Sequence, residues 1–222
     1  MPMQPNRIAP APWSLTGIGF VLLYHFPALF NQQFGFMQDY QQKGYKGWIG
    51  AVMLVDYNSS DVGPYYELLY IPGLFDLGEE LTFSIFKIYV SSYDSLWNAR
   101  ENWAIPKELA QFNVTRLPDG SHLYRAEQQS RTFFELQVKP KGWQIPFSSK
   151  LLPLSRIMQL NHYGELLLTN IAASGQVRFC SLQKVYSDPA FFPPLNQLKP
   201  LATLTIRDFL MFFPVAKRFK SI

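Results

Sequence analysis

The stretch Asn98–Phe112, NARENWAIPKELAQF, governs how the rest of the chain is interpreted. It places one lysine, Lys107, directly after a proline and among the apolar residues Trp103, Ile105 and Leu109. Burial disfavours the charged form of a lysine, and a neutral amine is a nucleophile. The sequence Pro-Lys-Glu-Leu is also a common start for a surface helix with two solvated charges. The stretch therefore indicates either an activated lysine or an ordinary helix start.

Most of the chain is patterned as short strands. Apolar runs rich in aromatic and β-branched residues, bounded by Gly, Pro, Asn and Asp, are typical of β-strands. The expected strands are Trp13–Phe26, Gly44–Tyr57, Tyr65–Ile71, Leu81–Ser91, Asn113–Leu117, His122–Glu127, Thr132–Val138, Trp143–Pro146, Ser155–Gln159, Glu165–Ile171 and Gln176–Val185. Leu201–Phe213 fits a strand or a helix, and Pro118-Asp119-Gly120 predicts a hairpin turn.

Helical patterns are few. Ser92–Trp103 predicts a helix with Asp94 as its N-cap, and Pro106 follows its end. Arg100 and Glu101 on this helix are interpreted as structural supports. Ala28–Tyr40 fits a short helix, and Met1–Pro12 an extended arm.

Many strands against one strong helix predict a mainly β (α+β) fold, a closed or nearly closed antiparallel barrel. The interior of such a barrel can be dry and still admit a small ligand. We expect a single domain over residues 1–222, with residues 1–12 as its N-terminal arm, because no linker or repeat divides the chain.

Composition excludes several classes of protein. Twenty basic and 16 acidic residues give a net charge of +4 without clustering, so no nucleic-acid partner is expected. The single cysteine, Cys180, allows no disulfide framework and favours a reducing, cytoplasmic compartment. No signal peptide and no membrane-spanning run is evident. His25, His122 and His162 lack metal-ligand spacing, so neither a metal nor a cofactor is expected.

Two segments resemble the acetoacetate decarboxylase family. NARENWAIPKELA resembles the family's segment G-R-E followed by P-K-K-L, and the family's Schiff-base lysine falls on Lys107. Asp61–Gly73, DVGPYYELLYIPG, resembles the family's segment that carries an active-site glutamate, which falls on Glu67. Pro193-Pro194-Leu195 resembles a third family segment less specifically. The resemblance implies a closed antiparallel β-barrel or cone with peripheral helices, and commonly a homo-oligomer.

The chain departs from the family's pattern at three places. Glu108 stands where the family has a second lysine, and a carboxylate there raises the pKa of a neighbouring lysine. Trp13–Phe26 lacks the family's substrate-binding arginine, and His25 is the only polar ring near it. A second family glutamate falls on Gly50 or its neighbours. These departures predict a larger and more apolar pocket than the family's.

Three functions follow from the resemblance and these departures. The first is a Schiff-base lyase that acts on an oxo acid through Lys107, with Glu67 as the acid. The second is another Schiff-base enzyme, an aldolase or dehydratase, and the third is a non-catalytic binder of a small apolar ligand in the barrel. Tyr65, His25 and Glu108 are the candidate substrate-binding residues.

Overall fold

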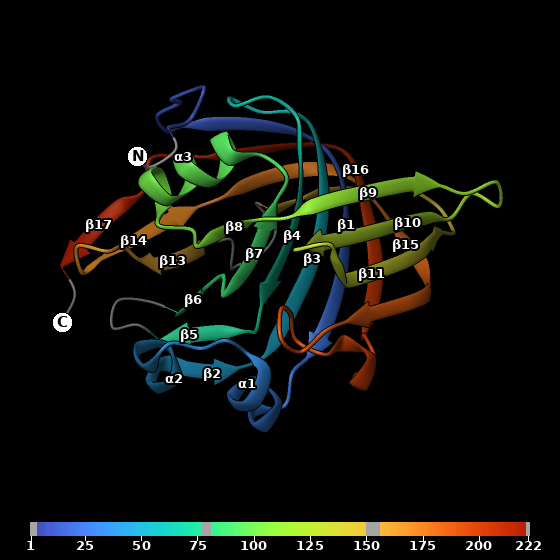
Figure 1. The fold of residues 1–222 in the computed structure, drawn as a ribbon, viewed down its shortest axis with the longest axis horizontal. Helices are drawn as coiled ribbons and strands as arrows, with labels where there is room; N and C mark the ends of the chain where they lie inside the picture. Colours follow the sequence, from blue (N-terminus) through green and yellow to red (C-terminus); the bar gives the residue numbers. More distant parts are fainter. Residues whose placement is uncertain (1–3, 77–80, 150–155, 221–222) are drawn as a thin grey trace.

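The structure, a computed structural model, describes residues 4–76, 81–149 and 156–220, and two β-sheets make up most of it (Figure 1). The strands are β1 (Trp13–His25), β2 (Tyr45–Gly47), β3 (Ile49–Ser59), β4 (Tyr65–Ile71), β5 (Leu74–Asp76), β6 (Leu81–Phe83), β7 (Lys87–Val90), β8 (Lys107–Leu109), β9 (Gln111–Arg116), β10 (His122–Gln128), β11 (Arg131–Pro140), β12 (Ile145–Ser148), β13 (Arg156–Leu160), β14 (Glu165–Asn170), β15 (Ala172–Ser187), β16 (Ala202–Phe213) and β17 (Lys217–Lys220). The helices are α1 (Ala28–Phe34), α2 (Asp39–Gly44) and α3 (Tyr93–Trp103), with a 3₁₀ turn at Leu195–Gln197. The predicted class, mainly β with few helices, is confirmed.

The larger sheet is strongly curled and has the order β8-β7-β4-β3-β1-β16-β15-β11-β10-β9, with β12 added beside β15. Strand β1 lies near its middle and pairs with β3 on one side and β16 on the other, so that Trp13 lies opposite Phe213. The register between β1 and β3 shifts between Thr16 and Gly17, and a Cβ atom at Gly17 would lie 2.1 Å from the carbonyl oxygen of Asp56. Glycine therefore permits the close approach of β1 and β3 at this point.

The smaller sheet has the order β17-β14-β13-β6-β5-β2. Its strands come from distant parts of the chain, and β6 and β13 meet in parallel at one pair, Phe83 and Ile157. Helices α1 and α2 lie near β2 and β5, while α3 lies beside β7, β8 and β14 (Figure 1).

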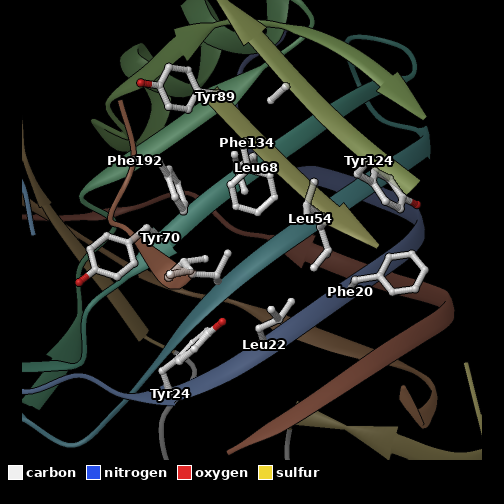
Figure 2. Packing of buried hydrophobic residues seen from close by; sticks show 14 of the residues in the cluster. Phe20, Leu22, Tyr24, Leu54, Leu68, Tyr70, Tyr89, Tyr124, Phe134 and Phe192 are labelled. Carbon is white, nitrogen blue, oxygen red and sulfur yellow. The ribbon is translucent and has the colours of Figure 1, made fainter. Parts of the chain in front are cut away.

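Strands β1, β3 and β4 are buried on both faces. Because side chains alternate along a strand, each strand contributes to two separate cores. One face packs against β10 and β11, where aromatic side chains fill the interior of the curled sheet (Figure 2). Its labelled members are Phe20, Leu22, Tyr24, Leu54, Leu68, Tyr70, Tyr89, Tyr124, Phe134 and Phe192.

The opposite face of the same strands packs against α3 and parts of the smaller sheet. Its side chains include Trp13, Val55 and Leu69 from β1, β3 and β4, with Trp103 of α3 and Ile157 of β13. Aromatic side chains therefore fill one side of these strands, and the expectation of a small ligand in the barrel stays a prediction. The cavity described below lies on this opposite face.

The expected strand Leu81–Ser91 is two strands that belong to different sheets. Between β6 and β7 the chain leaves the ladder at Ser84 and Ile85. The amide of Gln159 accepts a hydrogen bond from the Ser84 hydroxyl at 3.1 Å and donates one to the Ile85 carbonyl at 3.0 Å. A distant side chain thus satisfies the polar groups at the break. Gly44–Tyr57 is likewise divided, at Trp48, into β2 and β3.

Helix α3 lies close to its expected position, but its N-cap is Ser92. The hydroxyl of Ser92 accepts a hydrogen bond from the Ser95 amide at 3.2 Å, and Ser92 has the extended backbone of an N-cap. The prediction of Asp94 as N-cap is wrong; its carboxylate accepts a hydrogen bond from the Asn6 amide at 2.7 Å. Leu201–Phe213, open between strand and helix, is strand β16.

Two asparagines of α3 bind the N-terminal arm, which is described from residue 4 onwards. The Asn98 side chain accepts a hydrogen bond from the Ala9 amide at 2.7 Å and donates one to the Arg7 carbonyl at 2.7 Å. Asn102 donates to the Ala9 carbonyl at 2.9 Å. The side chains of α3 thus replace a partner strand for this part of the arm.

Replacing Asn98 should release the arm. Asn98→Leu removes the acceptor for the buried Ala9 amide and the donor to the part-buried Arg7 carbonyl, so we expect a loss of about 2–3 kcal/mol in the free energy of unfolding. Urea denaturation measures this loss. Glu101→Ala, an exposed change on the same helix, is the control and should alter stability by less than about 0.5 kcal/mol. Equal losses in both variants would contradict the anchoring role.

Candidate active site

Lys107 opens strand β8 and is buried, with 4% of its surface exposed. Helix α3 ends at Ala104 in the left-handed conformation, and β8 then pairs in parallel with β7, placing Lys107 opposite Ile88. The guanidinium of Arg100 donates a hydrogen bond to the Lys107 carbonyl at 2.5 Å. The alternative of a solvated helix start is wrong. Through this hydrogen bond Arg100 supports the backbone at Lys107, in line with the structural role expected for it.

The Lys107 ammonium group has three protein partners. Its Nζ atom lies 2.8 Å from Glu67 Oε2, 2.9 Å from Ser95 Oγ and 3.4 Å from the Tyr65 hydroxyl. It also lies 4.9 Å from the centre of the Tyr65 ring. The other oxygen of Glu67 accepts a hydrogen bond from the Tyr57 hydroxyl at 3.0 Å. Lys107 and Glu67 thus form a buried ion pair held in place by three hydroxyl groups.

Two opposing effects act on the lysine. Burial lowers the pKa of Lys107, but the charge of Glu67 and the hydrogen bonds from Glu67 and Tyr65 raise it, and the net pKa lies above its ordinary value. Lys107 is therefore charged while Glu67 is its partner. Burial raises the pKa of Tyr65 to about 12 although Lys107 opposes this, and burial with the Glu67 charge raises that of Tyr57 further. Both tyrosines are neutral donors or acceptors.

A cavity of about 510 Å³ lies beside this pair. Its walls are residues of β1, β3 and β4 with α3, β16 and parts of the smaller sheet, and nearly all of them are apolar. Among the described residues, Lys107 and Glu67 are the charged side chains of the lining. The cavity thus offers one ion pair within an apolar surface.

The other two predicted binding residues lie elsewhere. Glu108 follows Lys107 on the strand, so its side chain points to the other face, where its carboxylate meets Lys87 Nζ at 2.5 Å. The raised pKa of Lys107 thus comes from Glu67, not from Glu108. His25 is exposed at the end of β1 and does not line the cavity. Of the predicted site residues, the structure brings together Lys107, Glu67 and Tyr65.

Sequence reasoning missed Tyr57 and Ser95. Tyr57 lies opposite Tyr65 in the β3–β4 ladder, so pairing the two strands across the turn at residues 60–63 could have found it. Ser95 lies one turn before Ala99 on the buried side of α3. No local sequence signal marks this serine, because its contact with Lys107 depends on how α3 packs on β8.

Residues 4–76, 81–149 and 156–220 contain no group of three His, Cys, Asp or Glu side chains arranged to hold a metal ion. In the same ranges no helix has both the length and the apolar character needed to cross a membrane.

Residues 48–188 match the acetoacetate decarboxylase (ADC) family. The chain belongs to this family. The matched range carries Tyr57, Tyr65, Glu67, Ser95 and Lys107, which are all the residues of the ion-pair network. No curated protein matches the chain by sequence.

Solved structures of acetoacetate decarboxylase-like proteins share the fold. Acetoacetate decarboxylase from Legionella pneumophila has a TM-score of 0.75 at 13% identity, covering 99% of this chain and 92% of that one. An acetoacetate decarboxylase-like enzyme from Sphingomonas wittichii RW1 has a TM-score of 0.73 at 11% identity, covering 97% and 95%. The enduracididine biosynthesis enzyme MppR, complexed with pyruvate, has a TM-score of 0.68 at 11% identity, covering 96% and 92%. These structures confirm the fold implied by the sequence resemblance.

Removing the carboxylate should destabilise the protein in a pH-dependent way. In Glu67→Gln, burial acts on Lys107 without its counter-charge, so we expect a loss of about 3–5 kcal/mol at pH 7. The pKa of Lys107 then falls below its unfolded value of about 10.4, so the stability of this variant rises with pH up to that value. In the parent protein the pKa of Lys107 is raised. Its contribution to the free energy of unfolding is therefore complete below about pH 10.4 and is lost only as the pH rises above this value. Urea denaturation between pH 6 and 10 should therefore show a rise of stability with pH in the variant relative to the parent protein.

The double variant Glu67→Gln, Lys107→Met is the control. Removing both charges leaves no unpaired ion, so it should recover most of the stability that Glu67→Gln loses. Losses that simply add in the double variant would contradict a direct ion pair.

Proposed function

We propose that the protein is a Schiff-base lyase that acts on an oxo acid through Lys107. The observation that supports this most is the 2.8 Å contact between Lys107 Nζ and Glu67 Oε2 at the wall of a mostly apolar cavity. A lysine at this place can reach a bound carbonyl group, and its partner can take its proton. The pyruvate complex of MppR, a relative in fold, adds that such a fold can bind an oxo acid.

The reaction begins with a proton transfer within the pair. Lys107 passes one proton to Glu67, which an apolar ligand favours, because excluding water raises the cost of two buried charges. The neutral amine then adds to the carbonyl carbon and forms a carbinolamine. Glu67 returns the proton to the carbinolamine hydroxyl, which leaves as water, and an iminium ion results.

Loss of carbon dioxide follows from the iminium ion. When the carboxylate is on the carbon next to the iminium carbon, as in a 3-oxo acid, the electron pair of the bond between these two carbons moves towards the positively charged nitrogen, releasing carbon dioxide and leaving an enamine. One proton from solvent, delivered by Glu67 or a water, converts the enamine into the iminium ion of the product. Water then hydrolyses this ion, and the ketone and the Lys107–Glu67 pair are restored.

The hydroxyl groups around the pair hold it in position for these steps. Tyr57 donates to the Glu67 oxygen that does not face Lys107, which directs the other oxygen to the amine. Ser95 and Tyr65 hold Nζ at the cavity wall. An aldolase or dehydratase would use the same iminium ion with a different fate for the enamine.

A second candidate function is a non-catalytic binder of an apolar ligand. The raised pKa of Lys107 favours it, because a lysine that keeps its proton forms no imine. Trapping the imine distinguishes the two functions.

Borohydride reduction should trap the imine on Lys107. With a panel of oxo acids, we expect an added mass on the peptide that carries Lys107, measured by mass spectrometry. Lys107→Ala should abolish the adduct, whereas Lys87→Ala, which removes a lysine paired on the other face of β8, should retain it. If no oxo acid is trapped between pH 6 and 9, the binder is the better account.

The pH dependence of trapping tests the role of Glu67. A proton passed from Lys107 to Glu67 leaves the total charge of the pair unchanged, so the rate in the parent protein should be nearly flat between pH 6 and 9. In Glu67→Gln the proton must go to solvent, and the rate should rise about tenfold per pH unit below the pKa of Lys107. A steep rise in the parent protein would show that Glu67 is not the proton acceptor.

A further inference from the structure

The polar side chains of the cavity lie at one end of its β3–β4 wall. Along the cavity face of β4, Tyr65 and Glu67 come first and Leu69 and Ile71 follow. Tyr57 of β3 lies opposite Tyr65, and at the other end of the ladder Ala51 lies opposite Ile71. Ile71 is four positions beyond Glu67 on β4, which is about 13 Å at about 3.3 Å per residue. The wall thus has a polar head end and an apolar tail end.

The tail end borders the solvent at Trp48. This side chain lines the cavity, is 51% exposed and stacks on Phe83 with 6.4 Å between ring centres. Leu23, Ile49 and Ala51 line the same end. Nothing in this part of the described lining can hold a charge.

Charge fixes the order of groups along a ligand. An unpaired charge buried against an apolar wall is strongly unfavourable. In the proposed reaction the Lys107 nitrogen carries the positive charge of the iminium ion, so the carboxylate of the ligand must lie near it, at the head end. Away from the pair, the described lining has one hydroxyl group, that of Ser149, which accepts a hydrogen bond from the Ala173 amide at 2.8 Å and carries no charge. The rest of the ligand must therefore be apolar.

We infer that the substrate is a 3-oxo acid with a long apolar chain, its carboxylate and ketone at Lys107 and its chain along β3 and β4 towards Trp48. The inference rests on the proposed function, because it takes Lys107 as the imine-forming residue. In the reaction, the 3-oxo acid and one proton give carbon dioxide and a methyl ketone. The electron pair of the broken bond passes into the iminium ion, and the proton ends on the new methyl group.

A series of 3-oxo acids of increasing chain length tests this inference. Release of the methyl ketone is followed for 3-oxobutanoate, 3-oxooctanoate and 3-oxododecanoate. We expect kcat/KM to rise about fourfold for each added methylene that the tail end buries. Equal or falling kcat/KM along the series would overturn the inference.

Ala51→Leu provides the positional test. The larger side chain occupies the tail end, so kcat/KM for 3-oxododecanoate should fall at least about tenfold. The value for 3-oxobutanoate, whose chain does not reach this end, should fall far less, and circular dichroism checks that the variant folds. The matched control is Ala28→Leu, at an exposed position of α1, and should leave both values unchanged. An equal effect of Ala51→Leu on both substrates would overturn the placement of the chain.

Binding of the product ketones separates this inference from the proposed function. Displacement of an apolar fluorescent probe measures their affinity without any chemistry at Lys107. Trapping of short oxo acids on Lys107 without any effect of chain length would overturn the inference alone. Chain-length-dependent binding of ketones without an adduct on Lys107 would overturn the proposed function and, with it, the assignment of a substrate.

Discussion

Burial of β1, β3 and β4 on both faces is the constraint on which the rest of the structure depends. Alternation along each strand sends one set of side chains into the aromatic core and the other to the cavity. The aromatic side chains fill their side and fix the positions of the three strands. The wall that carries Glu67 is therefore supported from behind by a packed core, and the site needs no loop to position its acid.

The ion pair holds the lysine in its charged state, whereas the proposed reaction needs the neutral amine. Glu67 keeps Lys107 charged, and the same carboxylate is the nearest group able to take the proton away. Helix α3 binds this lysine twice, through Ser95 at the side chain and through Arg100 at the carbonyl. The amine thus has a fixed position, and only its proton has to move.

Sequence patterns predicted the fold class, most strands and the importance of Lys107 and Glu67, because these depend on local alternation and on two segments that resemble one family. The features that the sequence did not predict depend on long-range packing. The break after β6 depends on Gln159, some seventy residues later in the chain, and Glu108 turns away from the site because its strand neighbour faces the cavity. The contact of Ser95 depends on the docking of α3. The oligomeric state and the cytoplasmic location stay predictions.

The pairing of β1 with β16 has a consequence for the order of events during synthesis. Leu15 and Met211 pair across this ladder, and both line the cavity. A nascent chain can form the β1–β3 and β3–β4 ladders early, but the cavity lacks one wall until the last long strand leaves the ribosome. Contacts between such distant residues form slowly. A ligand can therefore stabilise the finished protein but cannot assist the early stages of its folding.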